Sequence, residues 1–238
     1  MKIAVCISGG MKFPEKSLQS LSCIFPNDDV KVFIHTWYIP DEDSYKDSCY
    51  SYTNPSGSYH TTNDIRFDIL SQFNYSKLLI ENYDEKKPRF ENLFNALKFS
   101  SYIRHDIGPI SMWYSISKCV QLKTSYELEN QITFDRVIRM RFDSDFQDKI
   151  LDLTDINEEL YIPSGRDWGK INDQFVMGSS RAVDRYADLY NQIHHLVNVE
   201  YCSENMLLEH ISREHLNVTK FDFKIDINNS QGPQESWI

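Results

Sequence analysis

Short apolar runs and amphipathic segments follow one another along this chain, and their order predicts alternating strands and helices. Residues 2–8 form an apolar, β-branched run that stops at Gly9-Gly10, which is typical of a buried strand followed by a tight loop. Residues 14–23 begin with a proline and place leucines at helical spacing, and residues 30–35 form a second apolar run. This strand–helix–strand order predicts a parallel βαβ unit.

The remainder of the chain continues the alternation. The pattern predicts strands at 76–81 and 135–142, a charged loop at 84–92, a helix at 111–129, a helix after Ser179-Ser180, a shorter helix with Ser203 as its N-cap, and a half-exposed strand at 218–227. Residues 40–64 contain almost no aliphatic side chain, so we expect a long loop there, either a mobile surface excursion or a lid or acceptor-facing loop. We expect an α/β fold with a mixed, mainly parallel sheet flanked by helices.

Composition narrows the classes of protein. A chain of 238 residues fits one domain, and its formal charge of −10 argues against a nucleic-acid partner, which needs an excess of positive charge. The five cysteines include no CxxC pair, which favours reduced thiols in the cytosol. Neither a signal peptide nor a run of about 20 apolar residues is visible, so we expect a cytoplasmic protein without a transmembrane segment.

The segment 136–146 carries the strongest chemical signal. Side chains alternate along a strand, so Ile138, Met140 and Phe142 are expected on one face. Arg139, Arg141 and Asp143 are expected on the other, with Asp145 in the same phase. An edge strand with an ordinary solvated face is the simpler interpretation of this pattern.

Two carboxylates at the end of a strand also have a chemical use. Asp143 and Asp145 together suit one hard cation such as Mg²⁺ or Mn²⁺. Such a cation bridges the phosphates of a nucleoside diphosphate and stabilises the charge that develops when the sugar–phosphate bond breaks. Arg139 and Arg141 are suited to phosphate oxygens.

Five segments together resemble a known family. They are KIAVCISGG, VFIHTW, MWYSISKC, RVIRMRFDSDF and INDQFVMGSS. In this order they look like bacterial and viral GT-A glycosyltransferases that build surface polysaccharides. The resemblance spans about residues 1–200. It implies a GT-A (Rossmann-like) fold, with residues 1–145 as the nucleotide-sugar-binding half and 146–238 as the acceptor half.

The resemblance also implies roles for individual residues. Ser8, Gly9 and Gly10 would line the base and ribose pocket, and Lys12 stands where such proteins often carry an arginine. His35 to Trp37 would face the same cleft. The alternatives are a plain turn and a core or rim tryptophan.

The helix at 111–129 would present Tyr114 or Lys118 to the nucleotide, although a simple core helix fits its pattern equally well. Asp143 and Asp145 match the DxD motif of the family, its metal and diphosphate site. Asp173 would be the catalytic base that takes the proton of an acceptor hydroxyl, unless it only orders its loop. His210 and His215 are candidates for a third metal ligand, or surface histidines on a helix.

The sequence therefore predicts a metal-dependent glycosyltransferase that uses Mn²⁺ or Mg²⁺, a UDP-, GDP- or dTDP-sugar and a glycan or glycolipid acceptor. Lys86, Lys87 and Arg89 form a weak basic cluster for transient contact with a membrane, or a solvated loop. The alternatives are a metal-dependent nucleotidyl- or phosphotransferase and a non-catalytic carbohydrate-binding domain. The chain lacks a GxxxxGK[ST] loop, which disfavours the phosphotransferase.

Overall fold

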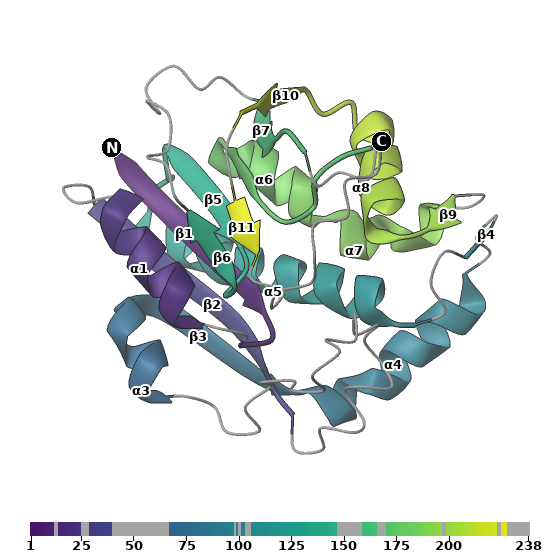
Figure 1. Ribbon diagram of the computed structural model, residues 1–238, viewed down its shortest axis with the longest axis horizontal. Coiled ribbons are helices and arrows are strands. Elements are labelled where there is room, and N and C mark those ends of the chain that lie inside the picture. Colours follow the sequence, from purple (N-terminus) through teal and green to yellow (C-terminus); the bar gives the residue numbers. More distant parts are fainter. Residues whose placement is uncertain are drawn as a thin grey trace.

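The computed structural model describes most of the chain (Figure 1). The described residues are 1–11, 14–24, 29–39, 67–97, 99, 101–102, 106–146, 159–165, 170–196, 199–222 and 225–227. The loop expected at 40–64 and the candidate ligand Lys12 lie outside these ranges.

The helices and strands alternate through most of the chain, as the apolar pattern predicts. In order they are β1 (Lys2–Gly9), α1 (Pro14–Ile24), β2 (Asp29–Tyr38), α3 (Phe67–Leu70), η1 (Ser71–Phe73), β3 (Tyr75–Asn82), α4 (Tyr83–Ala96), β4 (Ser101–Tyr102), α5 (Gly108–Asn130), β5 (Arg136–Met140), β6 (Ser144–Phe146), β7 (Leu160–Pro163), β8 (Val176–Gly178), α6 (Ser180–Ala187), α7 (Leu189–Gln192), η3 (Ile193–His195), β9 (Glu200–Tyr201), α8 (Ser203–Arg213), β10 (Val218–Phe221) and β11 (Ile225–Ile227).

Seven strands form the central sheet, in the order β10-β7-β8-β5-β1-β2-β3. Strand β1 pairs in parallel with both β2 and β5, and the pairs β2–β3 and β7–β10 are also parallel. Strand β8 runs antiparallel to β5 and β7. The expected mixed, mainly parallel sheet and the N-terminal βαβ unit are therefore confirmed.

Both faces of the sheet are buried, which explains the near-continuous apolar runs of β1 and β2. Ala4, Cys6 and Phe33 point to a core formed with α5 and α6. Ile3, Val5 and Ile7 point to the opposite core, formed with α1 and α3 (Figure 1). The buried thiols of Cys6, Cys119 and Cys202 are free, as expected of reduced cysteines.

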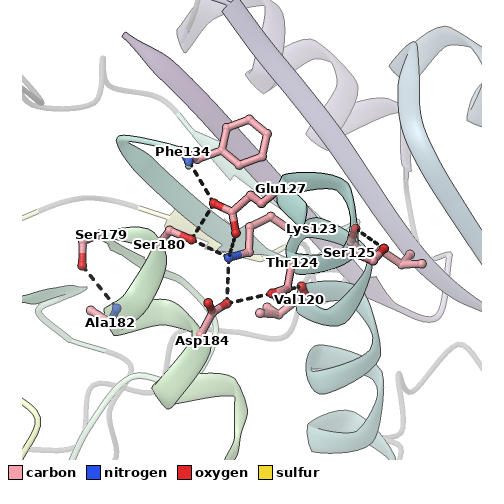
Figure 2. A network of polar contacts seen from close by, with 11 residues as sticks. Val120, Lys123, Thr124, Ser125, Glu127, Phe134, Ser179, Ser180, Ala182 and Asp184 are labelled. Atoms are coloured by element: carbon pink, nitrogen blue, oxygen red, sulfur yellow. Dashed lines mark hydrogen bonds and ion pairs between the residues drawn. The ribbon is translucent and has the colours of Figure 1, made fainter. Parts of the chain in front are cut away.

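Helix α5 is attached to α6 by a buried polar network (Figure 2). The ammonium group of Lys123 has no exposed surface and contacts Glu127 at 2.8 Å, Asp184 at 2.7 Å and Ser180 at 2.5 Å. The other oxygen of Glu127 accepts hydrogen bonds from Ser180 Oγ and from the backbone N–H of Phe134, both at 2.8 Å. Because each group has partners, the network is a structural connection between α5, α6 and the start of β5.

The charged loop predicted at 84–92 is wrong, because these residues lie within helix α4. The side chain of Asn82 caps this helix by accepting a hydrogen bond from the backbone N–H of Asp84 at 3.0 Å. Tyr83 and Phe90 anchor the helix in the core. The segment contains many charged residues and Pro88, so its sequence shows no clear helical pattern of apolar positions.

The strand predicted at 135–142 ends early, at Met140. The chain then turns, and Ser144 closes the turn: its hydroxyl accepts from the N–H of Arg141 at 3.2 Å, and its N–H donates to the Arg141 carbonyl. Ile138, Met140 and Phe142 do share one core, as expected. Arg139, however, points into the opposite core, so no solvated face carries it together with Arg141 and Asp143.

Three predictions in the C-terminal third also need correction. Residues 218–227 do not form one strand: β10 joins the central sheet and β11 pairs with β6 in a separate one. The helix after Ser179 begins as predicted, with Ser179 as its N-cap, but it is divided into α6, α7 and η3. The N-cap of α8 is Cys202, and Ser203 is its first residue.

Candidate functional site

The candidate residues collect at one edge of the central sheet. Strands β1, β2, β3 and β5 are parallel, so their carboxyl ends meet at the same edge. Strand β8 is antiparallel to β5 and pairs Val176 with Arg139, so the segment before β8, which contains Asp173, reaches this edge as well. In open α/β sheets this edge is the usual place for ligands.

The loop after β1 is built on a backbone conformation that favours glycine. Gly9 has φ of +115°, and a Cβ atom at this position would meet no neighbour within 4 Å. The hydroxyl of Thr36, from β2, donates to the Gly9 carbonyl at 2.9 Å and fixes the loop. The Ser8 hydroxyl is buried and has no partner within the described part of the chain. The loop thus presents open backbone at the sheet edge, with the unpaired Ser8 hydroxyl buried beneath it.

Beyond β5, Arg141 and Asp143 form a bidentate ion pair. Both guanidinium–carboxylate distances, Nε to Oδ1 and Nη2 to Oδ2, are 2.8 Å, and the Asp143 side chain is only 4% exposed. Asp145 differs, because its side chain is 36% exposed and its nearest cation is Lys16 Nζ at 4.0 Å. The two carboxylates therefore play different parts: Asp143 is paired with an arginine, and Asp145 is open to a ligand.

Arg139 and Asp173 meet beneath this edge. Arg139 is fully buried, and its Nη1 donates to the backbone carbonyl of Asp173 at 2.5 Å. The side chain of Asn172 braces the same segment by bonding the Gly165 carbonyl at 3.0 Å and the Gln174 N–H at 2.8 Å. The Asp173 carboxylate itself makes no hydrogen bond or ion pair to any described residue. Its backbone is fixed, and the side chain is buried, with only 6% of the residue exposed and no described partner for the carboxylate.

Several buried donors around Arg139 lack partners. These are the Arg139 Nε and Nη2 groups, the Tyr186 hydroxyl and the Ser8 hydroxyl, counted over the described residues. Burial lowers the pKa of Arg139 and raises the pKa of Tyr186, which the nearby arginine opposes. Unpaired buried donors are costly, so they mark a place where an anion or an ordered water fits.

A second polar cluster occupies the ends of β2 and β3. His35 is fully buried between Ser115, whose hydroxyl lies 2.6 Å from Nδ1, and Glu81, whose Oε2 lies 2.9 Å from Nε2. Glu81 Oε1 also accepts from the Tyr114 hydroxyl at 3.1 Å and pairs with Lys86 at 2.9 Å. The hydrogen bond from His35 is the main cause that lowers the pKa of Glu81 to about 2. Burial lowers the pKa of His35, so the imidazole is neutral and donates from Nε2 to the carboxylate.

This Ser115–His35–Glu81 order is that of a nucleophilic triad, but its burial gives it another role. Neither Ser115 nor His35 has any exposed surface, so no substrate reaches the hydroxyl. The cluster instead fixes the ring of Tyr114, which stacks on Trp37 with centroids 5.7 Å apart. Tyr114 is 2% exposed, so the structure favours the core alternative for this residue, while Lys118 is half-buried.

The candidates for a third metal ligand do not join the aspartates. His210 is buried on α8, where Nε2 contacts the Arg185 carbonyl at 2.8 Å, and burial lowers its pKa. His210 and His215 line a hollow of about 360 Å³ between η3 and the end of α8. Over the described ranges, no three His, Cys, Asp or Glu side chains are gathered as metal ligands.

The contact of Glu81 with His35 and Tyr114 is not among the contacts that the sequence pattern predicts. Glu81 stands at the end of an apolar run, on a strand parallel to the one that carries His35. This position indicates that Glu81 lies near His35, because parallel strands bring their carboxyl ends together.

Comparison with known protein families gives a match to just under half of the chain. A family model described as a domain of unknown function (DUF7796) matches residues 107–224, from the start of α5 to just beyond β10. The matched part contains Arg139, Asp145 and Asp173. No curated protein matches the chain. No helix among the described residues is both long and apolar enough to cross a bilayer.

Proposed function

We propose that this protein is a glycosyltransferase of the GT-A type, which transfers a sugar from a nucleotide-sugar donor to a glycan acceptor. The observation that supports the proposal is the convergence at one sheet edge of the glycine loop after β1, the Arg141–Asp143 pair with Asp145, and the free carboxylate of Asp173. Phosphate-binding cations, an open carboxylate and a candidate base are the groups that such a transfer needs.

Each part of the site has a proposed role. Ser8, Gly9 and Gly10 hold the nucleoside, because the loop lets a ligand approach the backbone closely. Arg141, held in place by Asp143, binds the diphosphate by charge-assisted hydrogen bonds, and the unpaired N–H groups of Arg139 add positive charge beneath it.

A divalent cation fits this site as an ion that arrives with the diphosphate. Mg²⁺ is usually held by one or two carboxylates together with substrate phosphates and water, so an enclosed protein cage is not required. Asp145, with its exposed carboxylate, would hold the ion, and Asp143 lies two residues away beside Arg141. When bound, Mg²⁺ or Mn²⁺ would supply charge stabilisation for the departing diphosphate.

The transfer itself exchanges one bond for another. An acceptor hydroxyl oxygen bonds to the anomeric carbon of the sugar, and the bond from that carbon to the diphosphate oxygen breaks. For an inverting transfer, Asp173 takes the hydroxyl proton, because its carboxylate has no competing partner in the described structure and its backbone is anchored by Arg139.

The test is release of nucleoside diphosphate from UDP-, GDP- and dTDP-sugars with Mn²⁺ and a mixture of glycan acceptors. We expect release by the wild-type protein and by Asp29→Ala, whose lost carboxylate lies at the opposite edge of the sheet, paired with Lys31. Asp145→Ala should lose activity while remaining folded. Wild-type turnover by Asp145→Ala would refute the metal assignment, and release of a sugar 1-phosphate in place of the nucleoside diphosphate would favour a nucleotidyltransferase.

A further inference from the structure

A group of cations surrounds two tyrosines beyond the ends of β2 and β3. The guanidinium carbon of Arg89, from α4, lies 5.8 Å from the ring centroid of Tyr114 and 5.6 Å from that of Tyr190. The ammonium nitrogen of Lys118, from α5, lies 5.5 Å from the Tyr114 centroid. Lys86 is held close by through Glu81. We call Lys86, Arg89, Lys118 and Tyr190 the cationic patch.

The patch carries positive charge that the described protein does not neutralise. Lys86 pairs with Glu81, but Arg89 and Lys118 form no ion pair with any described carboxylate. The whole chain has a formal charge of −10, so this group of cations differs in sign from the net charge of the protein. Local positive potential of this kind attracts anions and raises their concentration at a site.

A buried hydroxyl gives an independent sign of a missing ligand. Tyr190 is 7% exposed, and its hydroxyl has no hydrogen-bond partner in the described part of the chain. Its ring packs edge-on against Tyr114 at 5.1 Å, which fixes it beside Arg89. A phosphate or carboxylate bound by Arg89 and Lys118 would satisfy this hydroxyl, since either group accepts several hydrogen bonds.

The position of the patch separates it from the proposed donor site. In the sheet order, β1 stands between β5 and β2, and β3 lies beyond β2, so two to three strand spacings of ~4.8 Å place the patch about 10–14 Å from the end of β5. The two phosphates of one nucleoside diphosphate share an oxygen and do not bridge this separation. A ligand of the cationic patch is therefore a second anionic group, separate from the diphosphate of the donor.

We propose that the cationic patch binds an acidic group of the acceptor, so that the acceptor glycan carries uronic acid or phosphate substituents. This inference rests on the proposed function, because a glycan is an acceptor only if the protein transfers a sugar to it. The binding of an acidic glycan to the patch is measurable without any transfer.

The experiment is a calorimetric titration of the protein with an oligogalacturonide, a malto-oligosaccharide of the same length, and inorganic phosphate. We expect the acidic oligosaccharide to bind and the neutral one to bind at least about tenfold more weakly. Arg89→Gln and Lys118→Gln should each weaken the acidic ligand, and the double variant should lose about tenfold or more. The matched control Lys31→Gln removes one cation at the opposite edge of the sheet and should bind as the wild type does.

Tyr190→Phe separates binding from folding. It removes a hydroxyl that has no described partner, so thermal stability should not fall, while affinity for the acidic ligand should. Equal affinity of all variants would overturn the proposal, and so would inorganic phosphate binding as tightly as the oligosaccharide. Loss of nucleotide binding in Arg89→Gln would assign the patch to the donor instead. If the acidic glycan binds but no nucleotide does, the proposed transferase fails and the patch stands.

Discussion

Replacing Lys123 by methionine should destabilise the protein strongly. The ammonium group is fully buried and lies within 2.8 Å of Glu127 and 2.7 Å of Asp184 (Figure 2). Its removal leaves two carboxylates facing each other without a cation. Breaking a buried pair in this way costs about 3–5 kcal/mol.

The structure places the expected value at the lower end of this range. Glu127 keeps the hydrogen bonds from Ser180 and Phe134, and Asp184 keeps Thr124 and is 37% exposed. We expect a loss of about 3 kcal/mol, which for a chain of this size lowers the melting temperature by about 6–12 °C.

The assay is thermal unfolding followed by circular dichroism, with Lys77→Met as the control. Lys77 makes equally short contacts, 2.8 Å to Ser125 and 2.6 Å to Glu129, but Glu129 is 60% exposed. An exposed pair contributes under about 1 kcal/mol, so the control should lose much less. Adding Glu127→Gln to Lys123→Met removes one of the two carboxylate charges left without a cation and should restore part of the loss. Equal losses in Lys123→Met and Lys77→Met, or no recovery in the double variant, would refute the reasoning.

Two further changes probe the sheet edge. Burial lowers the pKa of His35 below its usual value of 6.5. When the pH falls below 6.5, the unfolded chain therefore binds a proton that the folded protein does not bind. The free energy of unfolding should then drop by up to about 1.4 kcal/mol per pH unit. The midpoints of urea unfolding at pH 7.5 and at pH 5.5 should differ less for His35→Gln than for the wild type. Part of the pH dependence should remain, because burial also lowers the pKa of His210. An unchanged difference would count against a neutral His35. Asp173→Asn should lower transfer by about 10²-fold or more with an unchanged melting temperature, because its carboxylate has no described partner; near-normal transfer would remove Asp173 as the base.

The strands of the sheet were predictable because their signal is local. β1 and β2 are apolar runs bounded by glycine or polar residues, and burial on both faces produces such runs directly. β3 lies at the edge of the sheet and is half-buried, but the run Leu78, Leu79 and Ile80 still marks it as a strand. Helix α4 was not predictable in this way. Its stability depends on two apolar anchors, Tyr83 and Phe90, that pack against Trp37 from a distant strand.

The sequence pattern predicted which residues are candidates for the site, but not how they are arranged. The alternation from Arg136 to Asp145 gives no sign that the chain turns after Met140, since Phe142 continues the apolar phase. The contact between Arg139 and the Asp173 carbonyl joins residues 34 positions apart, and it arises only when β8 pairs with β5. Local patterns do not contain such pairings.

The most direct test of the glycosyltransferase proposal is a thermal-shift comparison of UDP, GDP, CMP and dTDP, each with Mn²⁺ and with EDTA. The account predicts that one nucleotide stabilises the wild-type protein only with the metal. At a concentration of about 100 times the Kd the gain is about 2.7 kcal/mol, or about 5–10 °C for this chain length. The shift should disappear in Asp145→Ala and persist in Asp29→Ala. No shift with any nucleotide, or the same shift in Asp145→Ala, would contradict the account.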